Sequence, residues 1–255
     1  MPRHARIKSE TGIYHVVLRG INQVQLFYDE LDKHAFLTRL ARYKDEGLYQ
    51  VYAYALMGNH VHLLIKEDED SVSVSIKKLT VSYCHYFNTR YDRTGYLFAG
   101  RFKSMPVESD TYLLAVLRYI HHNPVKIGKP ISFWTSYSDY LTASGCTDAD
   151  FILSMFDDDK AQARKQFEKF LNEEEELSIP EELVILSAET ASRLTDEQAI
   201  EIISEIAEGR ICSKLAGLAK EPRDKLLRHL RGRGLSVRQI SRLTGISRGI
   251  VQEIK

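Results

Sequence analysis

Two histidines separated by one residue are the first feature of this chain whose type and spacing could do chemistry. His60 and His62 lie in the run GNHVHLLI, which begins at Gly58 and has the apolar alternation of a strand. Successive side chains of a strand point to opposite faces, so we expect both imidazoles on one face, opposite Val61. Histidine suits Mn²⁺, and Mg²⁺ can be held this way if water and phosphate oxygens complete its shell. Such pairs also occur at sheet edges that bind nothing, so the context decides between the two interpretations.

A tyrosine on a predicted helix supplies a candidate nucleophile. The apolar spacing predicts a helix over residues 110–122, with N-cap candidates at its start and the pair Asn123-Pro124 at its end. Tyr119 flanks the apolar stripe, so we expect it beside the buried face rather than within it. Asn123 follows one helical turn later on the same side. We expect the intervening His121 and His122 to be surface residues.

These groups match the needs of phosphodiester cleavage. A tyrosine oxygen can attack a phosphodiester in line and conserve the bond energy in a phosphotyrosine, which the released 3′-hydroxyl can later attack to rejoin the strand. A free phenol has a pKa of about 10, so a neighbouring group must favour its ionised form or accept its proton. A cation would polarise the phosphate and offset charge on the leaving oxygen. Most helical tyrosines are packing residues, and Tyr83, Tyr86 and Tyr112 compete with Tyr119 for the role.

The elements that must position these groups are mixed strands and helices. The Gly58-Asn59 pair predicts a tight turn between two strands. The order β-α-β-β-α-β-α favours an α+β domain with a largely antiparallel sheet and helices packed against it. The expected strands cover residues 14–19, 49–57, 60–66 and 97–107, and the expected helices cover residues 29–46, 72–90 and 110–122.

Three motifs together resemble a known family. They are NHVH from Asn59, GYLF from Gly95 running into RFK at Arg101, and YIHHNPV from Tyr119. In this order and spacing, over about residues 8–140, they resemble the single-tyrosine HUH transposases, and most closely the REP-associated tyrosine transposase type. The resemblance implies a ferredoxin-like antiparallel sheet with the two histidines on its central strand and the tyrosine on a nearby helix.

The same resemblance implies roles for individual residues. His60 and His62 become ligands of a divalent metal, Mg²⁺ or Mn²⁺, and Tyr119 becomes the nucleophile that forms a 5′-phosphotyrosine. Asn123 becomes a third metal ligand, although several relatives have a glutamine there, whose side chain reaches one methylene further.

The resemblance also implies a nucleic-acid partner. The expected substrate is single-stranded DNA, often with a hairpin beside the cleavage point, and the chain could act as a monomer or a homodimer. In the second motif, Arg101 and Lys103 are expected to contact this DNA.

Charge divides the chain into three segments despite a net charge of zero. Residues 1–140 carry 18 Lys/Arg and 14 Asp/Glu, residues 141–209 carry 5 and 18, and residues 210–255 carry 12 and 3. The acidic middle is typical of a solvated helical connector. The basic end, which has helical periodicity, favours a polyanionic partner.

The basic end also has the pattern of a helix-turn-helix. In the run SVRQISRLTGISRGIVQ, Ser236 and Ser247 can cap two helices and Gly245 can form the turn between them. The second helix would enter the major groove of duplex DNA. A basic helical hairpin used only for packing is the alternative. The residues that we expect to contact DNA are Arg238, Arg242, Arg248 and Gln252.

Composition disfavours a membrane or disulfide-stabilised protein. The sequence has no apolar run of about 18 residues and no apolar signal core near its start. Its three cysteines, Cys84, Cys146 and Cys212, are scattered and odd in number, which disfavours a disulfide framework or a zinc cluster. We therefore expect a cytoplasmic protein with no membrane partner.

The sequence thus predicts a two-part DNA-handling enzyme. Its expected parts are an HUH nuclease domain over residues 1–140, an acidic helical connector over 141–209 and a helix-turn-helix domain over 210–255. The expected function is metal-dependent nicking and strand transfer of single-stranded DNA in transposition. The alternatives are a domesticated relative that processes hairpin DNA for its host, and a catalytically silent DNA-binding regulator.

Overall fold

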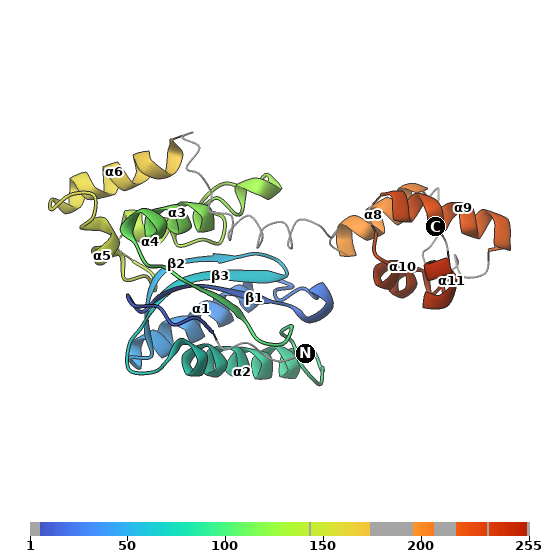
Figure 1. Cartoon of the computed structure of the whole chain (residues 1–255), viewed down its shortest axis with the longest axis horizontal. Coiled ribbons are helices and arrows are strands. Elements are labelled where there is room, and N and C mark those ends of the chain that lie inside the picture. Colours follow the sequence, from blue (N-terminus) through green and yellow to red (C-terminus); the bar gives the residue numbers. More distant parts are fainter. Residues whose placement is uncertain (1–5, 143, 174–195, 207–217, 234, 254–255) are drawn as a thin grey trace. The chain divides into compact units, whose positions relative to one another are not determined.

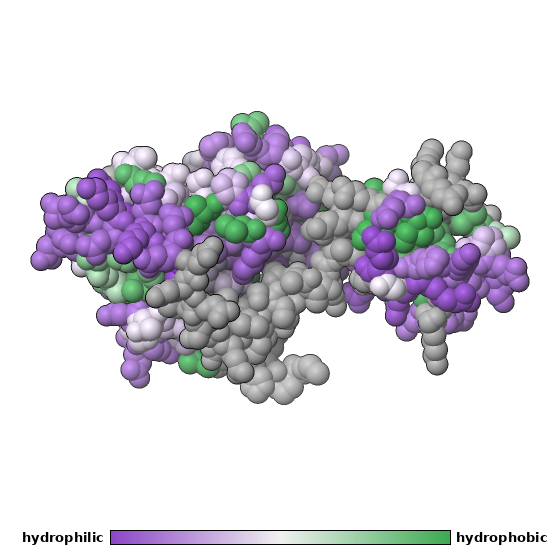
Figure 2. Space-filling view, turned by 90° about the horizontal axis from the view of Figure 1, so that it is seen from above, coloured by the Kyte–Doolittle hydropathy of each residue, from purple (hydrophilic) through white to green (hydrophobic). Residues whose placement is uncertain are grey.

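The computed structural model describes residues 6–142, 144–173, 196–206, 218–233 and 235–253. The chain divides into two compact units, residues 1–180 and 181–255. The first unit is an α+β domain, and the described part of the second unit is helical. None of the described helices combines the length and the apolar character that crossing a membrane requires. Hydrophilic side chains dominate the visible surface, and apolar residues form small scattered patches there (Figure 2).

The first unit is built on a four-stranded sheet with the order β2-β3-β1-β4, in which neighbouring strands are antiparallel. Helices α1 and α2 connect β1 to β2 and β3 to β4, so the β-α-β-β-α-β order and this strand order give the expected ferredoxin-like topology (Figure 1). The bounds are β1 Ile13–Arg19, α1 Glu30–Asp45, β2 Tyr49–Leu56, β3 His60–Glu67, α2 Val72–Arg90 and β4 Lys103–Pro106.

Helices α1 and α2 cover one face of the sheet (Figure 1). The alternation in β1 and β3 sends only apolar side chains to this face, where they meet apolar residues of both helices. Asp29 stabilises the start of α1 by accepting a hydrogen bond from the Asp32 backbone N–H at 3.0 Å. The strand residues of this core are Tyr14, Val16, Leu18, Val61, Leu63 and Ile65, and the helix residues include Phe36, Leu40, Ile76, Leu79, Tyr83 and Phe87.

The opposite face of the sheet carries α3, which begins at Asp110 and ends at His121 (Figure 1). The hydroxyl of Ser109 caps this helix by accepting from the Tyr112 backbone N–H. Three further helices of the first unit follow in the chain, α4 Tyr137–Thr142, α5 Ala149–Leu153 and α6 Lys160–Asn172.

The packing of α4 and α6 overturns our expectation that His121 and His122 lie at the surface. His121 is fully buried, with Nδ1 against the Leu117 carbonyl at 2.8 Å and Nε2 against the Ser136 hydroxyl at 2.9 Å. His122 Nε2 donates to the Leu171 carbonyl at 2.6 Å. His121 therefore connects α3 to the segment that precedes α4, and His122 connects α3 to the end of α6.

The same packing moves the boundaries that we expected. Tyr140 of α4 stacks on Phe167 of α6 with ring centroids 4.2 Å apart, so residues 144–173 complete the first unit and are not a solvated connector. Within this range α5 and α6 are separate helices, because residues 154–159 are not helical. The strand expected over residues 97–107 shrinks to β4, preceded by an isolated bridge at Phe98.

The second unit has four described helices around one apolar core. Helix α8, which we had placed in the connector, contributes Ala199 and Ile203 to this core. Ser236 and Gln239 form a capping box at the start of α10, and Gly245 ends that helix with φ of 74°. Helices α10 and α11 thus follow one another across a turn that begins at Gly245. The bounds are α8 Asp196–Ile206, α9 Lys220–Gly232, α10 Val237–Thr244 and α11 Arg248–Glu253.

Candidate active site between the sheet and α3

The two predicted histidines lie together on the α3 face of the sheet. His60 and His62 belong to β3, a central strand, and their ring centroids are 5.0 Å apart. His62 is 1% exposed, and the alternating Val61 lies in the apolar core of the opposite face. The prediction that both imidazoles share one face of a strand is confirmed.

A third histidine, His15 of β1, belongs to the same cluster and was missed by the sequence analysis. Its Nε2 lies 2.9 Å from Nδ1 of His62, and the two rings stack with centroids 5.2 Å apart. His15 is fully buried. The available signal was the alternation in β1, which places His15, Val17 and Arg19 on one face once β1 is paired with β3.

Tyr119 of α3 faces this cluster. Its ring centroid lies 5.5 Å from that of His62 and 5.9 Å from that of His15. At 5% exposure it is buried, whereas we expected it to flank the buried face. The reason is tertiary: the Tyr119 ring is enclosed by His15 and His62 of the sheet and by Lys126 of the segment after α3.

Several buried polar atoms of the cluster have no hydrogen-bond partner in the part of the chain that the structure describes. They are the Tyr119 hydroxyl, His62 Nε2 and His15 Nδ1. Buried polar groups are almost always paired, because leaving one unpaired costs roughly 1–3 kcal/mol. Three such atoms in one cluster therefore indicate a site for an external ligand.

Asn123 lies at the end of α3 and is also buried. Its side-chain nitrogen donates to the Tyr119 backbone carbonyl at 2.8 Å. This bond uses the amide donor to stabilise the end of the helix and leaves the carbonyl oxygen Oδ1 as the atom that could coordinate a cation. The structure thus brings Asn123, Tyr119 and the histidine pair into one region, as the motif order predicted.

Burial sets the protonation states of the cluster. It lowers the pKa of His15 and His60 to about 3, aided by the charge of Lys126, and lowers that of His62 well below its usual value. The three imidazoles are therefore neutral at pH 7, which is the form that binds metals. Burial also raises the pKa of Tyr119 to about 12, against the opposing influence of Asn123 and Arg19.

Lys126 supplies positive charge beside the phenol. Its Nζ lies 3.9 Å from the centre of the Tyr119 ring, and burial lowers the pKa of Lys126 to about 8. An ammonium group over an aromatic face is attractive and would also favour a phenolate. We did not predict a role for Lys126 from the sequence, because its contact with Tyr119 depends on the turn that follows Pro124.

A divalent cation fits the donor set of this cluster. His60 and His62 are neutral, and the buried His62 Nε2 has no partner in the described chain. The described residues contain no group of three or more His, Cys, Asp or Glu side chains arranged to hold a metal. A metal here would therefore depend on the two imidazoles, an amide oxygen such as that of Asn123, and oxygens from phosphate or water.

The fold and this cluster agree with a comparison of the sequence with protein families. Residues 8–123 match the model of a family described as "Transposase IS200 like". Over residues 8–123 the chain is therefore similar to IS200-like transposases. The match covers a little under half of the chain, and it includes His15, the histidine pair, Tyr119 and Asn123.

Two solved structures are similar to this chain. A REP-associated tyrosine transposase bound to a REP hairpin has 15% sequence identity and a TM-score of 0.48, with 56% of this chain and 86% of that chain covered. A candidate transposase from Deinococcus radiodurans R1 has 16% identity and a TM-score of 0.34, with 48% and 97% covered. None of the curated proteins compared by sequence matches this chain.

The residues predicted to contact DNA fall in both units. In the first unit, Arg101 and Lys103 are exposed, and Lys103 of β4 pairs with Val17 of β1. In the second unit the predicted residues are exposed on α10 and α11, and they are Arg238, Arg242, Arg248 and Gln252.

Proposed function

We propose that this protein nicks and rejoins single-stranded DNA through Tyr119, beside a divalent metal held by His60 and His62. The observation that carries the proposal is that the Tyr119 hydroxyl and His62 Nε2 are buried, have no hydrogen-bond partner among the described residues, and belong to rings whose centroids lie 5.5 Å apart. The similarity of residues 8–123 to IS200-like transposases supports it.

The metal site would use Mg²⁺ or Mn²⁺. His60 and His62 would coordinate it through their imidazoles, and Asn123 would add its Oδ1. When bound, the cation would polarise a phosphate and offset the charge that develops during cleavage.

His15 would orient His62 for this role. We assign the proton of their 2.9 Å contact to His62 Nδ1, which then donates to His15 Nε2 and leaves the lone pair of His62 Nε2 for a metal. In the opposite assignment His62 Nε2 would carry a proton and could not coordinate. A buried hydrogen bond to the second ring nitrogen is the usual device that fixes a ligand histidine.

In the cleavage step, the Tyr119 oxygen attacks the scissile phosphorus as the phenol loses its proton. A phosphotyrosine ester forms, the bond from phosphorus to the 3′-oxygen breaks, and that oxygen takes up a proton to become a 3′-hydroxyl. Two positive charges favour the developing phenolate. The Lys126 Nζ lies 3.9 Å from the centre of the Tyr119 ring, and the charge of Arg19 opposes the rise in the pKa of Tyr119. In the reverse step a 3′-hydroxyl attacks the phosphotyrosine and rejoins a strand.

A covalent-adduct assay tests this function. The protein is incubated with single-stranded hairpin oligonucleotides from its genomic flanks and Mn²⁺ or Mg²⁺, and adducts are resolved on a denaturing gel. We expect an adduct with the parent and with Tyr112→Phe, and none with Tyr119→Phe. An adduct that persists in Tyr119→Phe would assign the nucleophile elsewhere and contradict the proposal.

We also propose that α10 and α11 bind duplex DNA. The capping box at Ser236, the turn at Gly245 and the exposed basic residues of these helices support this function. Arg248→Gln should weaken duplex binding about tenfold without changing adduct formation, and equal duplex binding by the variant would contradict it. If the parent binds duplex DNA but forms no adduct with any oligonucleotide from its genomic flanks, the protein is better explained as a silent regulator. If the parent forms adducts but no strand transfer occurs in cells, a domesticated relative is the better explanation.

A further inference from the structure

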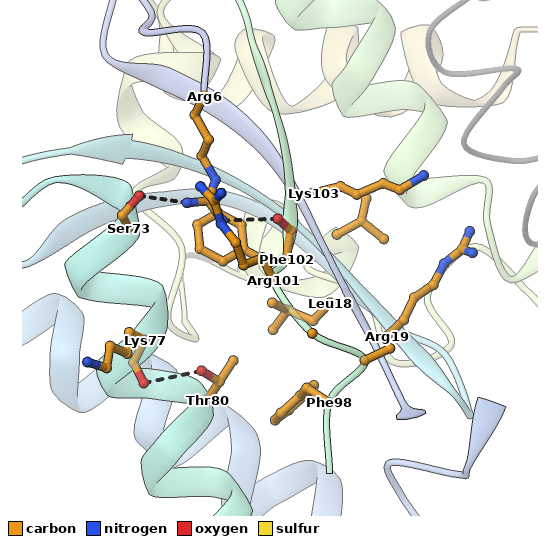
Figure 3. Close-up of a pocket in the computed structure, with 13 residues that line it drawn as sticks. Arg6, Leu18, Arg19, Ser73, Lys77, Thr80, Phe98, Arg101, Phe102 and Lys103 are labelled. Carbon is orange, nitrogen blue, oxygen red and sulfur yellow. Dashed lines mark hydrogen bonds between the residues drawn. The ribbon is translucent and has the colours of Figure 1, made fainter. Parts of the chain in front are cut away.

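A cavity outside the histidine–tyrosine cluster lies at the edge of the sheet beside α2. It has a volume of about 490 Å³, which falls in the usual range of about 300–1,000 Å³ for ligand pockets. Its walls come from the end of β1, one face of α2, the segment before β4, and Arg6 (Figure 3). The lining residues are Arg6, Val17, Leu18, Arg19, Ser73, Lys77, Thr80, Phe98, Ala99, Gly100, Arg101, Phe102 and Lys103.

The cavity exists because the chain leaves the sheet before β4 begins. Residues 103–106 pair with β1, Phe98 forms an isolated bridge with Gly20, and Ala99 still donates to the Arg19 carbonyl at 2.7 Å, but residues 100–102 belong to no strand. Gly100 allows this path with φ of 61°, and a Cβ at that position would meet nothing within 4 Å. Residues 100–102 therefore lie away from β1, which opens space above α2.

The lining is strongly basic. Five of its side chains are Arg or Lys, and none of the lining residues, all of which the structure describes, is Asp or Glu. Arg6 holds the wall in place: its guanidinium lies 3.7 Å from the centre of the Phe102 ring and donates to the Ser73 hydroxyl and the Phe102 carbonyl. A cavity with this charge and an aromatic wall suits an anion that also has an apolar part.

Figure 3 shows how the basic side chains are distributed. Arg19 and Lys103 extend away from α2, whereas Lys77 lies on α2 itself. In the strand register Arg19 is opposite His60, and Val17, the partner of Lys103, is opposite His62. The charge of Arg19 also lowers the pKa of both His60 and Tyr119. The basic lining therefore continues around the sheet edge to the candidate active site.

We infer that this cavity binds one nucleotide of the single-stranded DNA substrate, next to the segment held at Tyr119. Its phosphate is bound by Lys77 and Arg101, and its sugar and base lie against the apolar wall that includes Phe98. The continuity through Arg19 makes one DNA strand a better occupant than a free nucleotide. The inference rests on the proposed function, because it supplies the path by which that substrate approaches the tyrosine.

A binding experiment on the full chain tests the inference. The Tyr119→Phe protein is titrated into a fluorescent single-stranded oligonucleotide in EDTA, so that neither cleavage nor metal contributes, and the affinity is measured at several salt concentrations. The test variant adds Lys77→Gln and Arg101→Gln. The matched control adds Lys78→Gln, because Lys78 is the next residue of α2, pairs with Asp70 at 2.6 Å and does not line the cavity.

We expect the test variant to bind at least about tenfold more weakly than the control. Because Lys77 and Arg101 hold one phosphate, and each neutralised phosphate contributes about 0.7 to the slope of log affinity against log salt for single strands, the slope should fall by about 0.7. Deoxynucleoside monophosphate should compete only weakly. Unchanged affinity and slope in the test variant would overturn the inference. So would a monophosphate that competes as well as an unlabelled oligonucleotide at the same concentration.

The outcome is separable from that of the proposed function. Adduct formation by the parent with unchanged binding by the test variant would reject the cavity and leave the tyrosine chemistry intact. Weaker binding by the test variant, combined with no adduct in the parent, would support the cavity and reject the chemistry. Both variants change exposed side chains, and equal melting temperatures would show that they fold alike.

Discussion

The two faces of the sheet in the first unit are made by alternate residues of the same strands, yet they differ in chemistry. On the face toward α1 and α2, β3 contributes Val61, Leu63 and Ile65 to a closed apolar core. On the face toward α3, the same strand contributes His60 and His62, and the cluster there contains three buried polar atoms that have no hydrogen-bond partner among the described residues. The face toward α1 and α2 therefore contributes a closed apolar core to stability. The face toward α3 retains polar atoms that have no partner among the described residues, which costs stability and is typical of functional sites.

The largest expected effect is the loss of the covalent adduct in Tyr119→Phe. Because the hydroxyl of Tyr119 is buried without a partner, its removal should leave the free energy of unfolding unchanged or raise it. Tyr83→Phe on the opposite face should do the reverse: it removes a hydroxyl that donates to the Leu26 carbonyl at 2.6 Å, so stability should fall by about 1 kcal/mol while the adduct persists. Denaturing gels and urea unfolding measure both effects. Equal losses of stability would remove the contrast between the faces.

Neighbouring residues of β3 provide the next comparison. Leu63→Ala should lower the free energy of unfolding by about 2–5 kcal/mol, because it opens a cavity in a fully buried core, and the folded fraction should still form the adduct. His62→Gln should abolish the adduct with a smaller loss of stability. Urea unfolding and adduct assays on both variants check this. A larger loss of stability in His62→Gln than in Leu63→Ala would contradict the division of tasks.

His15 should affect metal binding without touching the metal. His15→Phe removes the hydrogen bond that fixes the His62 tautomer, so the affinity for Mn²⁺ should fall about 10- to 100-fold. Isothermal titration of metal into the protein measures this without DNA. The control is His85→Phe, which changes an exposed histidine on α2. A similar affinity in all three proteins would show that His15 only packs.

The smallest effect concerns acid stability in EDTA. The pKa of His15 and His60 is about 3 in the folded chain and about 6.5 when unfolded, so below pH 6.5 the unfolded chain binds more protons. Stability should be complete above pH 7 and fall on acidification from about pH 6.5 towards pH 3. Between pH 7 and pH 5 the loss should be on the order of 1–2 kcal/mol for each histidine. Urea unfolding at both pH values should show a smaller loss in His15→Phe, and an equal loss would contradict the burial of a neutral His15.

Local patterns predicted most elements of the fold. The alternation around His60, the cap at the start of the helix over residues 110–122 and the turn at Gly58 lie within a few residues of the structures they determine, and those structures occur where expected. Predictions failed where distant segments met. The packing of α6 on α4 buried His121, and the excursion before β4 shortened a strand that looked continuous in the sequence.

The sequence alone determined the order of the elements, the shared face of His60 and His62, and the selection of Tyr119 and Asn123, because strand and helix periods decide which side chains project together. Only the tertiary structure decided that His15 contacts His62, that Lys126 lies over Tyr119, and that basic residues from four segments line one cavity. The physical reason is that these neighbours are far apart in the chain. Their contacts depend on strand register and helix packing, which no local pattern specifies.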